Sequence, residues 1–320
     1  MVAGLSLRAI ATGLGRASST VSREVKRNGG DKRYRAVDAD DRATGCRARP
    51  QRLGLQKNPV LRNYVRVRLE KYWSPEQIAG RLKRDYPTNT RMHISHEAIY
   101  HAVYTNSTRK TFPGKVHTCL RRAQPLRHGK HYTTRGVWRS QIKEAAPLSK
   151  RPAEAETREV LGHWEGDLII GSNTSQVATI VDRTSRAVDL IKLPSRHAPV
   201  VVGCLSDRIG TYGPDRPTRT LTWDRGMELA AHQDLTAATG LGVYFADPHS
   251  PWQRGSNENT NGLVRQYLPK KTDLSLKSQA ELDQIASELN NRPRKCLGYQ
   301  TPLEVQHQLA HQTPSVALTI

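Results

Sequence analysis

The sequence of 320 residues predicts an α/β domain with a mixed five-stranded sheet, preceded by small all-α units. Apolar residues recur at helical spacing near the amino terminus, whereas alternating and continuous apolar runs begin near residue 158. Three strand-like runs come first in this second part, and two further runs then alternate with helical stretches. Strands joined by short turns pair antiparallel and strands joined by a helix pair parallel, so this order indicates a mixed sheet.

The first helical unit is predicted over residues 1–50. Residues 7–14 and 20–27 form two short helices, with Ser6 and Ser19 as N-caps and a glycine-containing turn between them. This pattern is typical of a helix-turn-helix, although any small helical hairpin shares it. The outward-facing residues that would enter a DNA groove are Ser19, Thr20, Ser22, Arg23 and Lys26.

A second helix-turn-helix-like unit is predicted over residues 58–106. Ser74 and Gln77 form a capping-box pattern at the start of one helix, and Ser95 caps another. Residues 107–157 are rich in arginine and proline and show no sustained period. We therefore expect a basic linker there, which either follows DNA phosphates or is a solvated tether without contacts.

The α/β domain is expected over residues 158–320. Its predicted strands are 164–170, 177–181, 188–193, 220–223 and 243–245. Its predicted helices are 199–209, 227–239, 256–268 and 278–290.

The net charge of +21 is concentrated in the first half of the chain. Residues 1–150 contain 32 Lys and Arg against 10 Asp and Glu, whereas residues 151–320 contain 18 against 19. Such a basic block is typical of nucleic-acid binding, of an anionic-membrane surface or of a ribosomal-type tail. We find no amphipathic helix with a clean apolar face, so the membrane interpretation is disfavoured and nucleic acid is the expected partner.

The composition also excludes several classes of protein. No apolar run approaches 18 residues, which argues against a transmembrane helix, and no apolar stretch of a signal peptide follows the start. The 4 cysteines lie far apart without a CxxC pair, so a zinc site or a disulfide scaffold is not expected. Reduced thiols and a cytoplasmic location fit this pattern best.

Three acidic residues stand out in the α/β domain. Asp167 lies within an apolar strand, Asp224 follows the end of another, and Glu258 lies among poor helix formers where a periodic helix nevertheless begins. Each acid alone is more often a cap or turn residue than a metal ligand. Together, three carboxylates with few competing His or Cys suit Mg²⁺ or Mn²⁺, and two such ions can clamp the reacting oxygens of a phosphoryl transfer.

The segments that contain these acids resemble the acidic motifs of DDE transposases, in particular those of the insertion-sequence family numbered thirty. They are HWEGD at 163–167, TWDRG at 222–226 and FADPHSPWQRGSNEN at 245–259. The stretch NNRPRK at 290–295 and the turn and second helix of the first helix-turn-helix also resemble this family. The resemblance covers nearly the whole chain, and its longest segment is the most specific.

The resemblance implies an RNase H-like catalytic core, related to retroviral integrase cores. It implies that Asp167, Asp224 and Glu258 are the catalytic residues and hold two Mg²⁺ or Mn²⁺ ions. The implied partner is double-stranded DNA, at the element ends and at the target. Because two ends must be brought together, we also expect a homodimer or higher oligomer on DNA. We expect Arg265, which is seven residues after Glu258, and Lys270 to contact DNA, although plain helix surface is the alternative.

Two departures from the family pattern bear on activity. The family usually has another helix before the first helix-turn-helix pair, whereas this sequence starts almost at the pair, so we expect a late start or a truncated copy. Lys271 stands where the family often has glycine. The alternative to an active transposase is therefore a decayed or truncated copy that acts only as a sequence-specific DNA-binding protein or repressor. A generic nuclease is a weaker third option.

Overall fold

The computed structural model describes residues 5–48, 54–105, 111–121, 145–247 and 250–312. The chain divides into two compact units, residues 1–57 and residues 58–320, which are described separately. In the described ranges no helix is both long enough and apolar enough to cross a bilayer.

The first unit is helical. Its helices are α1 (Leu7–Gly13), α2 (Ser18–Arg27), α3 (Gly30–Arg33), α4 (Ala36–Ala48) and α5 (Gly54–Lys57). Ser6 caps α1 as predicted, since its Oγ accepts a hydrogen bond from the Ala9 amide at 3.2 Å. The prediction that Ser19 caps α2 is wrong. The helix begins at Ser18, two residues earlier than predicted, and the Ser19 oxygens accept from the Arg23 guanidinium within the helix.

The second unit begins with a helical part. It contains α6 (Pro59–Glu70), α7 (Pro75–Asp85) and α8 (His96–Tyr104), with 3₁₀ turns at Thr90–Met92 and Val116–Cys119. Ser74 and Gln77 form the predicted capping box, and Ser95 caps α8 as predicted. The apolar faces of the three helices meet in a small core that includes Val65, Leu69, Ile78, Leu82 and Ile99.

Helix α7 packs on the carboxy-terminal segment of the same unit. Arg81 forms two hydrogen bonds of 2.8 Å with the Glu304 carboxylate, and the Gln77 amide donates to the Pro293 carbonyl at 2.8 Å. The ring of Tyr299 lies 2.3 Å from the position that a Cβ on Gly80 would occupy, so this glycine allows the close contact. The helical part is therefore joined to the α/β domain by direct side-chain contacts.

Residues 145–157, which we expected within the linker, pack on the α/β domain. They contain a 3₁₀ turn at Leu148–Lys150 and the short helix α10 (Glu154–Thr157). Pro147 bridges to Phe245, and the Phe245 amide donates to the Ala146 carbonyl at 2.9 Å. Arg151 is buried, with its guanidinium 2.8 Å from the Thr222 hydroxyl.

The α/β domain contains the predicted five-stranded mixed sheet. Its strands are β1 (His163–Ile170), β2 (Gln176–Asp182), β3 (Val188–Leu193), β4 (Thr220–Trp223) and β5 (Gly242–Phe245). The strand order is β3-β2-β1-β4-β5. The first three strands pair antiparallel, whereas β4 pairs parallel with β1 and β5 pairs parallel with β4. Each predicted strand agrees with an observed one to within two residues at either end.

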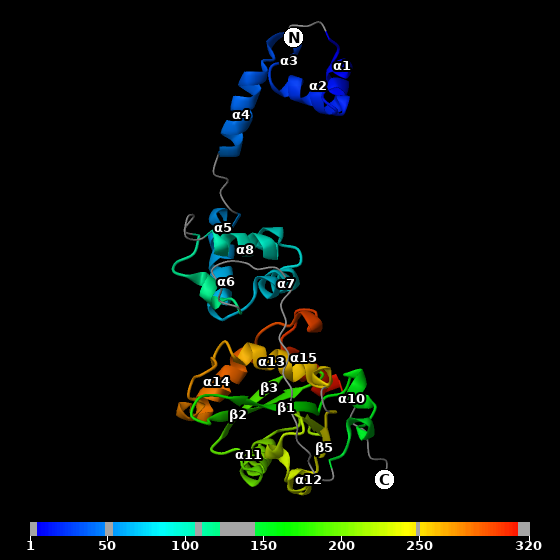
Figure 1. Cartoon of the computed structure of the whole chain (residues 1–320), viewed down its shortest axis with the longest axis vertical. Coiled ribbons are helices and arrows are strands. Elements are labelled where there is room, and N and C mark those ends of the chain that lie inside the picture. Colours follow the sequence, from blue (N-terminus) through cyan, green and yellow to red (C-terminus); the bar gives the residue numbers. More distant parts are fainter. Residues whose placement is uncertain (1–4, 49–53, 106–110, 122–144, 248–249, 313–320) are drawn as a thin grey trace. The chain divides into compact units, whose positions relative to one another are not determined.

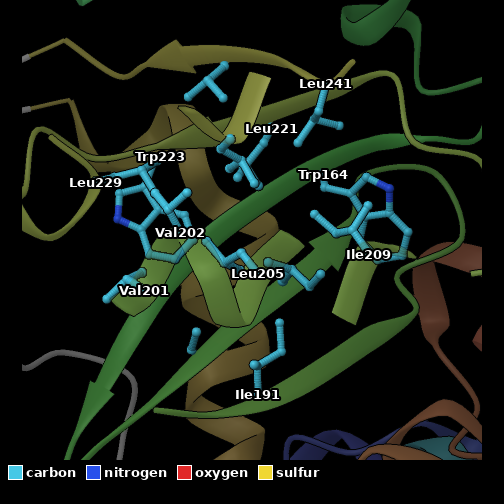
Figure 2. Close-up of a cluster of buried hydrophobic side chains, with 14 of the residues drawn as sticks. Trp164, Ile191, Val201, Val202, Leu205, Ile209, Leu221, Trp223, Leu229 and Leu241 are labelled. Atoms are coloured by element: carbon cyan, nitrogen blue, oxygen red, sulfur yellow. The ribbon is translucent and has the colours of Figure 1, made fainter. Parts of the chain in front are cut away.

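Helices cover both faces of this sheet (Figure 1). Helices α11 (Ala198–Gly210) and α12 (His232–Thr239) bury one face, where Trp164, Leu205 and Trp223 pack together (Figure 2). Helices α13 (Gly255–Val264) and α14 (Gln279–Asn290) cover the other face with Leu263 and Leu289. The remaining elements are α15 (Pro302–Gln312) and 3₁₀ turns at Met227–Leu229, Pro251–Arg254, Leu274–Leu276 and Lys295–Leu297.

Two predicted helices are shorter than expected. The stretch 227–239 is divided into the 3₁₀ turn at Met227–Leu229 and α12, because Ala230 and Ala231 form a turn between them. The stretch 256–268 is helical only as far as Val264, and residues 265–268 form turns that lead into Pro269. Proline cannot continue a helix and restricts the residue before it, which accounts for the early end of α13.

A buried ion pair connects β1 to two other parts of the domain. Glu165 is 0% exposed, and its Oε1 accepts a hydrogen bond of 2.9 Å from Arg183, which is 3% exposed. The Oε2 atom of Glu165 accepts from the Asn257 amide at 2.9 Å, in the first turn of α13. One carboxylate therefore holds the turn after β2 and the start of α13 against the first strand.

We predict that Glu165→Gln lowers the free energy of unfolding by about 3 kcal/mol, because it leaves the buried Arg183 cation without its full counter-charge. Urea denaturation of the variant and the parent chain measures this difference. Glu70→Gln is the matched control, since Glu70 is a half-exposed partner of Arg66 and should contribute little. Equal losses in the two variants would contradict the prediction.

The loop after α13 contains Lys271 in a left-handed conformation, with φ of 68°. The loop is held by the Ser172 amide, which donates to the Thr272 carbonyl at 2.9 Å. The structure therefore retains a tight turn at the position where glycine was expected, and a lysine there carries backbone strain.

We predict that Lys271→Gly raises the free energy of unfolding by about 0.5–1 kcal/mol, since relief of the strain exceeds the entropy that glycine loses on folding. Lys270→Gly is the control, because φ at Lys270 is not positive and the glycine should destabilise the chain. Urea denaturation of both variants is the measurement. Stabilisation by Lys270→Gly to the same extent would show that backbone strain at Lys271 is not the cause.

Candidate active site

Parallel pairing of β1 with β4 brings Asp167 and Asp224 to the same end of two neighbouring strands. The last pair in the register joins Glu165 to Thr222; Asp167 lies two residues later on β1, and Asp224 lies two residues later, directly after β4. Gly166 immediately precedes Asp167, and a Cβ at this glycine would lie 2.1 Å from the buried Trp223 ring. Gly166 is therefore required for the ring to pack against β1. The site lies at the carboxyl end of β4, where sheets of this type place ligands.

Arg254 lies between the two aspartates. Its Nη1 is 3.5 Å from Asp167 Oδ1 and 3.2 Å from the Gly166 carbonyl oxygen, and its Nη2 is 3.4 Å from Asp224 Oδ2. Burial raises the pKa of Asp167, and the Asp224 charge raises this pKa further, whereas Arg254 opposes both effects. The two carboxylates therefore share one cation.

Helix α13 is fixed to Asp167 by a network of amides and one hydroxyl. The Asn261 side-chain amide donates to Asp167 Oδ2 at 3.0 Å. The Thr179 hydroxyl on β2 lies 3.1 Å from Asn257 Oδ1 and 2.9 Å from Asn261 Oδ1. Residues three apart on a helix share a face, so Glu258 lies one turn before the contact that Asn261 makes.

The three predicted acids occupy the expected elements, but only two of them are in the same cluster. Asp167 is in β1, Asp224 follows β4, and Glu258 is in the first turn of α13. The Glu258 side chain is exposed, and the described residues include no group of three Asp, Glu, His or Cys side chains close enough to hold one metal ion. Asp167 and Asp224 are bridged through Arg254, and Glu258 is positioned by its helix alone.

The predicted DNA-contact residues occupy two different environments. On α2, all five proposed residues are exposed, whereas Val25 on the opposite face is buried. The five exposed residues are Ser19, Thr20, Ser22, Arg23 and Lys26. Lys270 is also exposed. Arg265 is half-buried and donates to the Ile170 carbonyl at 2.9 Å, so its guanidinium fixes the end of α13 to the end of β1.

The residues that position the acids are not among the predicted site residues. They are Arg254, Asn261 and Thr179, of which Arg254 and Asn261 lie in or next to the most specific motif. One signal was available, because the stretch 255–262 is rich in residues that disfavour helices. Its Asn257 and Asn261 amides are used for polar contacts to β1 and β2, which explains why weak helix formers occupy a helix.

Comparison with protein families identifies two domains in this chain. The model of the integrase core domain matches residues 157–251, a range that includes Asp167 and Asp224. A helix-turn-helix domain model matches residues 1–28. Among solved structures, the catalytic core domain of BIV integrase is similar, with 21% identity, a TM-score of 0.37 and coverage of 48% of this chain and 97% of that core.

Curated relatives match over nearly the full chain. The transposase InsI of insertion sequence IS30A from Escherichia coli strain K12 is 47% identical over 304 residues, which are 95% of this chain and 79% of the relative. The transposase of insertion sequence IS1086 from Cupriavidus metallidurans is 45% identical over 313 residues, covering 95% of this chain and 90% of the relative. With this identity and coverage, an integrase-type core and an amino-terminal helix-turn-helix, the chain belongs to the IS30 family of insertion-sequence transposases.

Proposed function

We propose that this transposase cuts DNA at the ends of its insertion element and joins the freed 3′ ends to target DNA, with Asp167, Asp224 and Glu258 as the catalytic carboxylates. The observation that carries the proposal is the pairing of β1 with β4, which places two aspartates side by side, together with the Asn261 contact that fixes α13 beside them. Phosphoryl transfer needs little covalent chemistry from the protein, so positioning and charge are the main requirements.

We further propose that these three carboxylates hold two Mg²⁺ or Mn²⁺ ions. The aspartate pair fits such ions, because hard divalent cations prefer carboxylate oxygens and Asp167 and Asp224 already share the Arg254 cation. Two bound ions stabilise the attacking and leaving oxygens of a phosphoryl transfer. The protein's own contribution is to orient Asp167 through Asn261 and Leu168, and Asp224 through the Gly226 amide.

DNA recognition is assigned to both units of the chain. We propose that the exposed face of α2 reads the terminal inverted repeat, and that Lys270 contacts the backbone beside the core. Arg265 is proposed to act on DNA near the end of α13, where its bond to Ile170 holds it in place. Since two element ends must be joined in one reaction, we propose a homodimer or higher oligomer on DNA.

A decayed copy that only binds DNA is the alternative. It predicts repeat binding without cleavage. The presence of Asp167, Asp224 and Glu258 in the expected elements favours the active enzyme, because loss of a single carboxylate would be enough to abolish metal-dependent transfer.

We predict that Asp224→Asn reduces cleavage of repeat-end DNA by at least about 100-fold, because the amide keeps the shape but removes a charge needed to stabilise the transition state. Binding to the same DNA should remain, and Mn²⁺ binding measured by calorimetry should weaken. Asp234→Asn, at an exposed position on α12, is the control. A variant at Asp224 that cuts at the parent rate with Mg²⁺ would show that Asp224 is not part of the catalytic site.

We predict that removal of residues 1–57 abolishes the preference for repeat DNA over scrambled DNA. The remaining chain carries 37 Lys and Arg against 24 Asp and Glu, so it should retain non-specific, salt-sensitive binding. Fluorescence anisotropy on both duplexes at one fixed salt concentration compares the full chain with the 58–320 fragment. Unchanged discrimination in the fragment would place sequence recognition outside the first unit.

A further inference from the structure

Arg254 reaches both aspartates of the site from the residue directly before α13. Its guanidinium lies 3.5 Å from Asp167 Oδ1 and 3.4 Å from Asp224 Oδ2. A third contact, of 3.2 Å, joins it to the Gly166 carbonyl oxygen. The side chain is nevertheless 18% exposed, so solvent reaches this cation.

The other carboxylate oxygen of each aspartate is held by an amide. Asp167 Oδ2 accepts a hydrogen bond of 3.0 Å from the Asn261 side chain, and Asp224 Oδ1 accepts one of 3.0 Å from the Gly226 amide. Asp167 Oδ1 also accepts from the amide of the next residue at 2.9 Å, but it is the oxygen that faces Arg254. The two oxygens that Arg254 contacts are therefore the ones that a single cation can share between the two carboxylates.

The contacts of Arg254 with these oxygens are long for an arginine in this core. Arg183 lies 2.9 Å from Glu165, and Arg208 lies 2.8 Å from Asp189. Hydrogen bonds between charged groups are typically about 2.7–2.9 Å long. At 3.4 and 3.5 Å, Arg254 compensates the charge of the aspartates without a short directional bond to either. A second cation can therefore displace it more easily than it could displace the two shorter pairs.

We propose that Arg254 competes with divalent ions for Asp167 Oδ1 and Asp224 Oδ2, and that it thereby lowers the affinity of the aspartate pair for Mg²⁺ or Mn²⁺. The proposal rests on the proposed function, because that function assigns metal ions to these carboxylates. A cation already present between two like charges reduces the attraction that a second cation gains there. Arg254 thus keeps the aspartates compensated and sets the ion concentration at which they exchange the guanidinium for metal.

A purely structural role of Arg254 predicts the opposite effect on metal binding. If Arg254 only fixed the start of α13 to the Gly166 carbonyl, its loss would loosen the carboxylates and weaken the binding of an ion. Competition predicts instead that loss of the guanidinium strengthens binding. The sign of the change in metal affinity separates the two roles.

Arg254→Gln and Arg254→Met test the competition in the full chain without DNA. Mn²⁺ binding is measured by calorimetry at pH 8, where carboxyl groups are ionised. Each variant should bind Mn²⁺ about 5–30-fold more tightly than the parent chain, because two ion pairs of a largely buried arginine no longer oppose the ion. Two variants are used because glutamine can still donate a hydrogen bond to an aspartate, whereas methionine cannot.

Arg196→Gln is the matched control. It removes the same charge at an exposed position after β3, which β2 separates from β1, so its Mn²⁺ affinity should equal that of the parent. Arg254→Gln combined with Asp224→Asn should bind no more tightly than Asp224→Asn alone, since the gain arises at the aspartate pair.

Parent-like or weaker Mn²⁺ binding in both Arg254 variants would overturn the competition, even if the parent chain cuts DNA. A gain that persists in the combination with Asp224→Asn would also overturn it, because the ion would then bind elsewhere. Conversely, tighter binding in both variants together with a parent chain that does not cut repeat-end DNA would leave the competition standing and would refute the proposed function instead.

Discussion

Repulsion between two carboxylates is the constraint around which the core is built. Asp167 lies on β1 and Asp224 directly follows β4, the parallel neighbour of β1, which places like charges together at a partly buried position. Such an arrangement is unstable unless cations and donors compensate for it. Arg254 supplies the cation, and the amides of Asn261, Leu168 and Gly226 supply donors. A helix made of weak helix formers is tolerated because its asparagines contribute to this compensation.

Much of the fold could be predicted because its signals are local. Strand boundaries follow from apolar runs and turn residues, and the capping box at Ser74 depends on residues three apart. Ser19 shows the limit of this reasoning, since a serine near a helix start can occupy the first turn instead of the cap. The early end of α13 shows another limit, because the apolar period continues to Leu268 while the backbone turns before Pro269.

The site was predictable only in part, for a different physical reason. The three acids could be identified because their spacing and the motifs around them indicate the chemistry of the site. Thr179 and Asn261 act through contacts between residues that are 78 to 94 positions apart. Arg254 contacts the Gly166 carbonyl, which is 88 positions away. No periodicity or local motif encodes such distances. Residues 145–157 were assigned to a linker for the same reason, since their contact partners lie in β4 and β5.

The positive charge of the chain therefore has two physical forms. Exposed lysines and arginines on α2 are solvated, so their attraction to DNA is long-ranged, weakly directional and screened by salt. Arg292 and Arg294 are buried against neutral oxygens, where solvent does not screen them, and their positions are fixed by the contact between α7 and the carboxy-terminal segment. Charge of the first form brings DNA to the protein from a distance, whereas charge of the second form acts at one place. Packing of the helical part on the core therefore determines where this buried charge lies.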